Sequence, residues 1–264
     1  MKLTDAQLEQ FDRDGFLILP SLFDPKEVEA INAELPALFA EDRVDNVREK
    51  GGGIVRTAMN LHARNDVFAK LVRHPRLLEP ALQILDGDVY LQQVKVNAKE
   101  AYTGEIWQWH YDFAHHHNED GNPLPLALNV HLFLDECNPF NGALWFIPGS
   151  HKAHDGRNLA KSALDTETTS YELWTVDHET VGRMIEAGGI VPAHGPAGTV
   201  LIFGELMVHG SPNNMSPWPR HIFSTIYNPI SNRQTTFKRP DWQHGRDFTP
   251  TRPLPDDCLR ERAA

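Results

Sequence analysis

The sequence WQWHYD (residues 107–112) carries the pattern from which both the fold and the chemistry of this chain can be inferred. His110 and Asp112 stand two residues apart, and on a β-strand this spacing places both side chains on one face. An imidazole and a carboxylate so placed can bind adjacent positions of one metal ion. A second histidine from a distant strand would complete the two-histidine, one-carboxylate set that leaves positions of a non-haem iron open. His209, in VHGS (208–211), is the candidate.

One His-x-Asp pair is weak evidence by itself, because the chain contains 14 histidines. Two further features strengthen the interpretation. His209 is followed by Gly-Ser, and Arg220 stands eleven residues beyond it, between Pro219 and His221. A guanidinium is a planar, permanently charged fork that suits bidentate binding of a carboxylate. The sequence therefore predicts a metal site with a carboxylate-binding arginine nearby.

The residues around this stretch alternate in the manner of β-strands. From residue 93 to residue 99, polar side chains alternate with valine and alanine, which predicts a strand with one polar and one apolar face. That polar face would point either to water or into a polar interior. Further strands are expected where β-branched and aromatic residues gather between turn sequences, at residues 16–19, 126–134, 143–147, 199–203 and 223–227. Many short strands separated by turns predict a mainly β domain with flanking helices, folded as a jelly roll.

Helices are expected mainly before the first long strand. Thr4 and Gln7 form a capping-box pattern, and Gly15 is the expected end of the helix that follows. Asp24 and the proline after it open a second helix, whose apolar face runs to Leu38. Residues 66–85 are expected to be helical with an interruption at His74-Pro75. These helices are interpreted as scaffold packed on the outside of a sheet.

The pattern predicts one domain over residues 1–264. It comprises N-terminal helices (about 1–86), a jelly-roll core (about 88–228) and a C-terminal tail (229–264) that wraps the outside or frays. Within the core, residues 152–192 are polar and irregular apart from a helical stretch near residues 179–186. Long insertions in compact domains usually have a function. We interpret this one as a lid over the barrel mouth that influences specificity.

Composition narrows the partners and the compartment. The chain has 264 residues and a formal net charge of -11, which argues against nucleic acid and anionic membrane surfaces as partners. Two cysteines form neither a disulfide framework nor a cysteine-rich zinc site. The first residues lack the apolar core of a signal peptide, and no apolar run approaches a membrane span. We therefore expect a cytoplasmic protein, a monomer or homodimer, that acts on a small molecule.

Several motifs resemble one known family. They are QVKVNAK (93–99), WHYD (109–112), Asn141-Gly142, IPGSH (147–151), and HGS (209–211) with Arg220. Together they are similar to the phytanoyl-CoA dioxygenase-like family, whose members are Fe(II)- and 2-oxoglutarate-dependent oxygenases on a double-stranded β-helix, a cupin-like jelly roll. The resemblance extends from about residue 3 to residue 228. It is strongest to the bacterial branch that hydroxylates free amino acids and related small zwitterions.

The resemblance implies roles for individual residues and cofactors. It implies Fe(II), 2-oxoglutarate and O2 as cofactor and cosubstrates, and hydroxylation rather than halogenation because the aspartate is present. Metal ligands would be His110, Asp112 and His209. Residues implied to bind 2-oxoglutarate are Arg220, Ser211, Asn97 and Gln93, the last two on the inward face of their strand. Residues implied to shape the substrate site are Arg56, Trp107, Phe113 and His116. In the His115-His116-His117 run, consecutive strand residues would point to alternate faces, so that one or two face the cavity.

Three alternatives stay open at this point. A zinc hydrolase also uses two histidines and a carboxylate, but it needs neither Arg220 nor the polar strand, and its metal content would distinguish it. A non-catalytic jelly-roll binding protein would be expected to lose a ligand or the arginine, and this chain retains all four. The same oxygenase chemistry on an acyl-CoA or a larger natural product is the third. No extended basic patch for a CoA phosphate is visible in the sequence.

Overall fold

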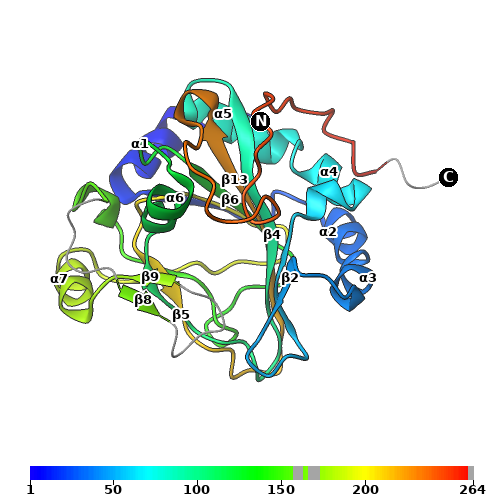
Figure 1. The fold of residues 1–264 in the computed structure, drawn as a ribbon, viewed down its shortest axis with the longest axis horizontal. Coiled ribbons are helices and arrows are strands. Elements are labelled where there is room, and N and C mark those ends of the chain that lie inside the picture. Colours follow the sequence, from blue (N-terminus) through cyan, green and yellow to red (C-terminus); the bar gives the residue numbers. More distant parts are fainter. Residues whose placement is uncertain (157–162, 166–172, 261–264) are drawn as a thin grey trace.

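The computed structural model describes residues 1–156, 163–165 and 173–260 of the chain. Its centre is a pair of antiparallel sheets with helices outside them (Figure 1). The large sheet has the strand order β1-β11-β6-β13-β4-β3-β2, and the small sheet has the order β10-β7-β12-β5. A mainly antiparallel arrangement in which both sheets line one cavity is the jelly roll expected from the sequence.

The large sheet is built around β13 (Arg220–Pro229), which pairs with β4 on one side and with β6 on the other. The remaining strands of this sheet are β1 (Phe16–Leu19), β2 (Asn46–Arg48), β3 (Val55–Met59), β4 (Val89–Lys99), β6 (Leu128–Phe133) and β11 (Val200–Gly204). The small sheet consists of β5 (Trp107–His110), β7 (Trp145–Phe146), β10 (Val191–Pro192) and β12 (His209–Ser211). Each strand predicted from the sequence is present, with shorter bounds in the region of β7.

The N-terminal helices have the caps that the sequence predicts. Thr4 and Gln7 form the capping box of α1 (Asp5–Asp14), and Gly15 ends that helix with a φ of 85°. The second predicted helix is divided into α2 (Pro25–Asn32) and α3 (Leu35–Ala40), and the third into α4 (Asp66–Leu71) and α5 (Pro75–Leu85). The latter division falls at the predicted His74-Pro75 interruption, because proline does not continue a helix that precedes it.

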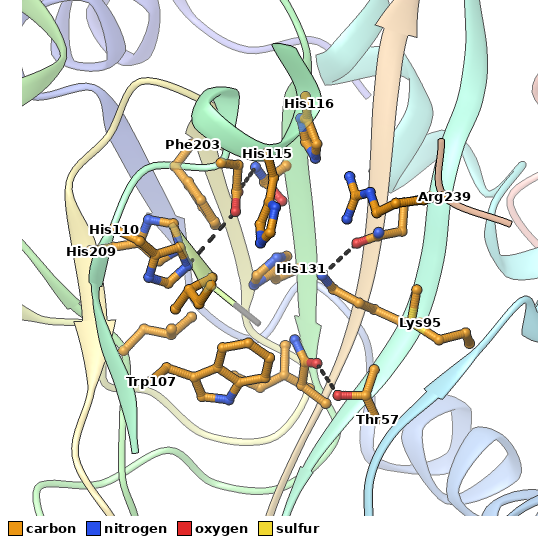
Figure 2. Close-up of a pocket in the computed structure, with 18 of the residues that line it drawn as sticks. Thr57, Lys95, Trp107, His110, His115, His116, His131, Phe203, His209 and Arg239 are labelled. Carbon is orange, nitrogen blue, oxygen red and sulfur yellow. Dashed lines mark hydrogen bonds and ion pairs between the residues drawn. The ribbon is translucent and has the colours of Figure 1, made fainter. Parts of the chain in front are cut away.

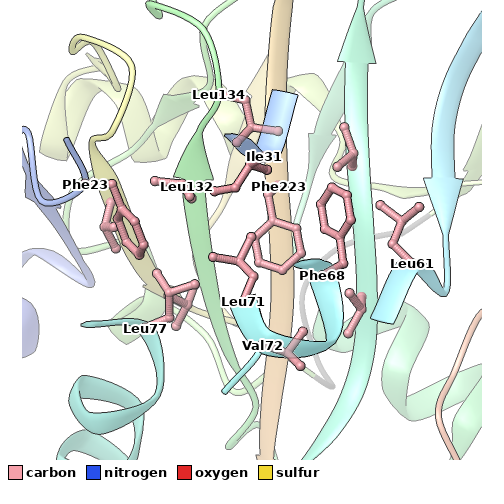
Figure 3. Packing of buried hydrophobic residues seen from close by; sticks show 14 of the residues in the cluster. Phe23, Ile31, Leu61, Phe68, Leu71, Val72, Leu77, Leu132, Leu134 and Phe223 are labelled. Carbon is pink, nitrogen blue, oxygen red and sulfur yellow. The ribbon is translucent and has the colours of Figure 1, made fainter. Parts of the chain in front are cut away.

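The apolar face of the large sheet packs against these helices. Figure 3 shows Phe68 and Leu71 of α4 against Phe223 of β13, and the Phe68 and Phe223 rings are 5.6 Å apart. Val94 and Val96 of β4 belong to the same buried cluster. Each fully buried side chain of this size stabilises the fold by about 1.5–3 kcal/mol. Because the helices cover the apolar face of β4, its polar residues must face the space between the two sheets.

One sequence-based expectation about local structure was wrong. His110 is the last residue of β5, whereas Asp112 is the N-cap residue of α6 (Phe113–Asp120) with φ -67° and ψ -30°. The two ligands therefore meet at a strand-to-helix junction instead of on one strand face. The run of three histidines also lies on α6, where successive side chains point about 100° apart around the helix rather than to two opposite faces.

The insertion is described only in part, since residues 157–162 and 166–172 of the predicted lid lie outside the described residues. Its described elements are the hairpin β8 (Ala163–Asp165) and β9 (Leu173–Thr175), and α7 (His178–Gly188), which covers the predicted helical stretch. The N–H of Val176 donates to the carbonyl of Trp109 at 2.8 Å, so this part lies against β5 (Figure 1). Within the described residues, none of the helices has the length and apolar composition needed to span a membrane.

Candidate active site

Three predicted ligands meet at one end of the cavity between the sheets. His110 and His209 are opposite each other in the pairing of β5 with β12, and their rings are 4.2 Å apart. The Nε2 atom of His110 lies 3.8 Å from Oδ1 of Asp112. One ligand atom from each residue can be chosen so that all three lie within 4.8 Å of one another. Strand pairing thus brings together residues that are almost one hundred positions apart in the sequence.

The hydrogen bonds around the ligands prepare them for a metal. The Nδ1 atom of His110 is 2.6 Å from the carbonyl of Gln108, and that of His209 is 2.9 Å from the carbonyl of Met207. A carbonyl only accepts, so each Nδ1 carries the proton and each Nε2 offers its lone pair to the cavity. Asn129 of β6 donates to Oδ2 of Asp112 at 2.8 Å. Hydrogen bonds of this kind orient the ligands of a metal site.

The protonation states also suit metal binding. Burial, reinforced by the neighbouring His209, lowers the pKa of His110 to about 3, so its imidazole is neutral at pH 7. Burial by itself raises the pKa of Asp112, but the nearby His209 and His110 more than offset this and leave it lowered overall. Asp112 is therefore ionised. Two neutral imidazoles and one carboxylate are the donor set that non-haem Fe(II) accepts with positions left open.

Arg220 lines the same cavity, at the start of β13. Only 2% of it is exposed, and its Nε atom has no hydrogen-bond partner among the described residues. Asn97 of β4 also lines the cavity and accepts a hydrogen bond from the hydroxyl of Thr57 at 3.1 Å. Ser211 is buried beside the cavity rather than in its lining, with an unpartnered Oγ in the described part of the chain. An anionic ligand would satisfy the buried guanidinium, and the unpartnered polar atoms beside it could bind the same ligand.

A second polar group lines the wall contributed by β4. Gln93 and Lys95 face the cavity, as the alternation predicts, and the Lys95 ammonium donates to Oε1 of Gln93 (Figure 2). Nε2 of Gln93 lies 3.1 Å from Nε2 of His244, whose Nδ1 is 3.0 Å from Asp120. Burial lowers the pKa of Lys95 to about 8 and that of His244 well below 6.5. A neutral His244 therefore donates to Asp120 and accepts from Gln93, which continues the chain of hydrogen bonds to Lys95.

The C-terminal tail, which was expected to wrap the outside or fray, also contributes a residue to the cavity. Arg239 lines the cavity and forms an ion pair with Asp120 at the end of α6. The tail contains the short helix η3 (Ile230–Asn232) and otherwise follows an irregular path. Neither Arg239 nor His244 belongs to a periodic segment or a motif, so no sequence signal identified them.

The predicted substrate residues divide into two groups. Trp107 and His116 line the cavity, and His116 is held by Glu205 at 2.7 Å (Figure 2). Arg56 is not part of the lining among described residues. Its Nη1 is paired with Glu49 and Glu105, and its guanidinium lies 4.1 Å from the centre of the Trp107 ring. Arg56 is therefore placed to hold Trp107, not to touch a ligand.

Phe113 is the other predicted residue that the structure places elsewhere. It is fully buried in a separate apolar cluster with Tyr111 and Val208. As the first residue of α6 it points away from the cavity, which His115 and His116 of the same helix reach instead. The resemblance implied that Phe113 shapes the substrate site, but because this residue begins a helix its side chain packs in the apolar cluster.

Comparisons with known proteins agree with this geometry. The profile of the phytanoyl-CoA dioxygenase family (PhyH) matches residues 11–222. An L-proline trans-4-hydroxylase from Streptomyces griseoviridis is 35% identical, over 97% of this chain and 98% of that protein. An ectoine dioxygenase from Nocardia farcinica is 33% identical, over 92% of this chain and 86% of that protein. The crystal structure of EctD from S. alaskensis with bound Fe has a TM-score of 0.82 at 30% identity, over 96% of this chain and 87% of that chain.

The chain belongs to the phytanoyl-CoA dioxygenase family. It is a dioxygenase that uses iron and 2-oxoglutarate, as the related EctD structures with Fe and with 2-oxoglutarate indicate. The residues present fit both groups. The His110, Asp112 and His209 donors suit the metal, and the unpartnered guanidinium nitrogen of Arg220 suits the far carboxylate of the cosubstrate. Neither a zinc hydrolase nor a non-catalytic binding protein requires this combination.

Proposed function

We propose that this enzyme hydroxylates an unactivated C–H bond of a free amino acid or a related small zwitterion. The observation that carries the proposal is the charge distribution in the cavity. Asp112 and the two histidines form one wall, and the cationic side chains of Lys95 and Arg239 lie on the wall that faces them (Figure 2). A substrate carboxylate bound on the cationic wall would hold the rest of a small molecule close to the metal site. The L-proline hydroxylase and ectoine dioxygenase relatives support this substrate class.

When bound, iron and 2-oxoglutarate supply the oxidising chemistry, in which O2 is consumed, the cosubstrate becomes succinate and CO2, and a substrate C–H becomes C–OH. The protein's residues position the reactants. Arg220 and Asn97 would hold the cosubstrate, with the hydroxyl of Ser211 beside them. Two residues would shape the substrate space. They are Trp107, which Arg56 supports, and His116, which Glu205 supports. Asn129 keeps the Asp112 carboxylate in one orientation throughout the reaction.

The same chemistry on a larger natural product is less well supported. The epimerase SnoN from nogalamycin biosynthesis is 21% identical to this chain, and the carbocyclase SnoK from the same biosynthesis is 19% identical, so both show the fold alone. For a zwitterion the enzyme would use a single substrate carboxylate, for which Lys95 is a sufficient partner.

We further propose that the enzyme works in the cytoplasm as a monomer or homodimer. Its two cysteines, Cys137 and Cys258, are both unpaired, which supports a reducing compartment.

The test is succinate formation from 2-oxoglutarate with Fe(II) and ascorbate, screened against free amino acids and cyclic zwitterions, with L-proline and ectoine first. A substrate should raise succinate formation well above the uncoupled rate and gain one oxygen atom in mass. The His110→Ala variant should abolish both signals. If every amino acid and zwitterion leaves the uncoupled rate unchanged, the substrate proposal fails, while the enzyme class is unaffected.

A further inference from the structure

His131 is a buried polar group for which the structure provides no partner. It lies on β6, two residues beyond Asn129, and its ring lines the cavity. Only 4% of the residue is exposed, and neither Nδ1 nor Nε2 has a hydrogen-bond partner among the described residues. Buried polar groups are nearly always satisfied, and each exception needs an explanation. A ligand that enters the cavity is one such explanation.

The position of His131 indicates which ligand this is. Along β6, Asn129 binds Asp112, and the pairing of β6 with β13 places Phe133 opposite Ile222, two residues from Arg220. His131 stands between Asn129 and Phe133 on this strand, and therefore between the metal ligands and the arginine. Figure 2 shows it near the middle of the labelled residues. A dicarboxylate that reaches from the metal site to Arg220 must pass this point. A substrate held at Trp107 and His116 need not do so.

His131 is not a further metal ligand. The Phe203 ring packs against it edge-on, with centroids 4.9 Å apart and an interplanar angle of 82°. The same Phe203 ring packs against His209, also at 4.9 Å. Phe203 thus contacts the imidazoles of both His131 and His209. The group of candidate ligands found in the described residues contains only His110, Asp112 and His209.

The chemistry of a neutral imidazole matches this role. Burial, reinforced by the nearby Lys95, lowers the pKa of His131 well below 6.5, so that one ring nitrogen carries a proton and the other accepts. The cosubstrate's oxygens only accept. We propose that His131 donates a hydrogen bond from its ring to bound 2-oxoglutarate and positions it between the metal and Arg220. The inference rests on the proposed placement of the cosubstrate, and it assigns a residue that no motif in the sequence indicates.

The experiment measures binding without turnover. Metal-free enzyme is loaded with Mn(II) in the absence of oxygen, and 2-oxoglutarate is titrated by calorimetry and by tryptophan fluorescence, to which Trp107 in the cavity contributes. His131→Phe keeps the ring that packs on Phe203 but removes both nitrogens. The expected result is a rise of about tenfold in the Kd for the cosubstrate, the usual cost of one lost buried hydrogen bond, with an unchanged Kd for Mn(II). His131→Gln, which retains an N–H donor, should recover most of the affinity.

The matched control is His62→Phe. His62 is a half-buried histidine whose buried Nδ1 is unpartnered in the described part of the chain, and it lines a different cavity, beside Arg73 and Asp241. The variant should bind 2-oxoglutarate as the wild type does. An unchanged Kd in folded His131→Phe would overturn the proposal, as would an equal loss of Mn(II) affinity, which would make His131 a metal ligand instead.

Two further measurements keep the outcome decisive. Arg220→Gln tests the placement of the cosubstrate by itself. If it leaves the Kd for the cosubstrate unchanged, 2-oxoglutarate does not reach Arg220 and the proposed arrangement fails. If it weakens binding while His131→Phe does not, only the role of His131 fails. Should His131→Phe not fold, nitrogen-15 NMR of histidine-labelled wild type with Zn(II) decides, since 2-oxoglutarate must then shift a ring-nitrogen resonance that is absent from His131→Gln.

Discussion

His221 provides a quantitative test of the electrostatics beside the cosubstrate site. It follows Arg220 on β13, and only 14% of its side chain is exposed. Its Nε2 lies 2.9 Å from Glu100 and its Nδ1 lies 2.8 Å from Asp135. Burial by itself lowers the pKa of His221, but hydrogen bonds to Asp135 and Glu100 raise it overall, to about 9. The ring is therefore a doubly donating imidazolium at pH 7, which ties β13 to residues just beyond β4 and β6.

The size and sign of its contribution follow from this pKa. Between 6.5, the ordinary value, and about 9, the native protein holds a proton that the unfolded chain has released. At about 1.4 kcal/mol per pH unit the full difference is about 3 kcal/mol, and the partial exposure of Glu100 reduces it to about 2 kcal/mol. Because the native state binds more protons here, this contribution to stability is complete below pH 6.5. It is lost as the pH rises through 9.

The perturbation is His221→Gln, which keeps a polar side chain but removes the charge. The free energy of unfolding in urea is measured for both proteins, without metal, at pH values from 6 to 10. We expect the variant to be about 2 kcal/mol less stable at pH 6, and the difference to shrink toward zero above pH 9. Subtraction of the two curves cancels the titration of the metal ligands. A difference that stays constant over this range would show that His221 is neutral in the fold and would refute the reasoning.

Two other predictions concern residues that act through their neighbours. Asn129→Ala removes the hydrogen bond to Asp112 and should raise the Kd for Fe(II) by about 10–100-fold, measured by anaerobic metal titration. Unchanged metal affinity would mean that Asp112 is oriented without Asn129. His244→Leu breaks the chain from Asp120 to Lys95, so we expect the KM for the amino-acid substrate to rise at least about tenfold while the KM for the cosubstrate stays the same. Equal changes in both KM values would indicate general damage to the cavity.

The sequence was sufficient to predict the architecture and the metal ligands of the site. Alternation along β4 distinguished its two faces, and only the resemblance indicated that the polar face points inward. The structure supplies the physical reason, since helices already cover the valines of that strand. The ligands were also predictable, because His110 and Asp112 are close in sequence and His209 stands in a recognisable motif. The prediction that both side chains lie on one strand was wrong, because the strand ends at His110 and a helix begins directly after Asp112.

The substrate end was much harder to predict, for a reason that the structure makes clear. Arg239 and His244 reach the cavity from an irregular tail, and their positions depend on partners more than one hundred residues away in sequence. Phe113 was assigned to the cavity from the resemblance and its place beside the metal motif, but as the first residue of a helix it packs in the apolar cluster. His131 carried no signal either, since a histidine in an apolar strand reads as an ordinary core residue.

The net charge of the chain does not predict the charge of the cavity. A formal net charge of -11 suggests a molecule that repels anions, yet Arg220, Lys95 and Arg239 all line this one site. Arg239 is neutralised by Asp120, which leaves two cationic side chains, the metal dication and the single negative charge of Asp112. A dianionic cosubstrate would reduce the formal sum from three positive charges to one, and a substrate carboxylate could pair with the cation that remains. Buried charge without such compensation is strongly unfavourable. The cationic side chains therefore favour a substrate that carries a carboxylate over one that carries none, and a substrate without a carboxylate that binds as tightly as L-proline or ectoine would contradict this.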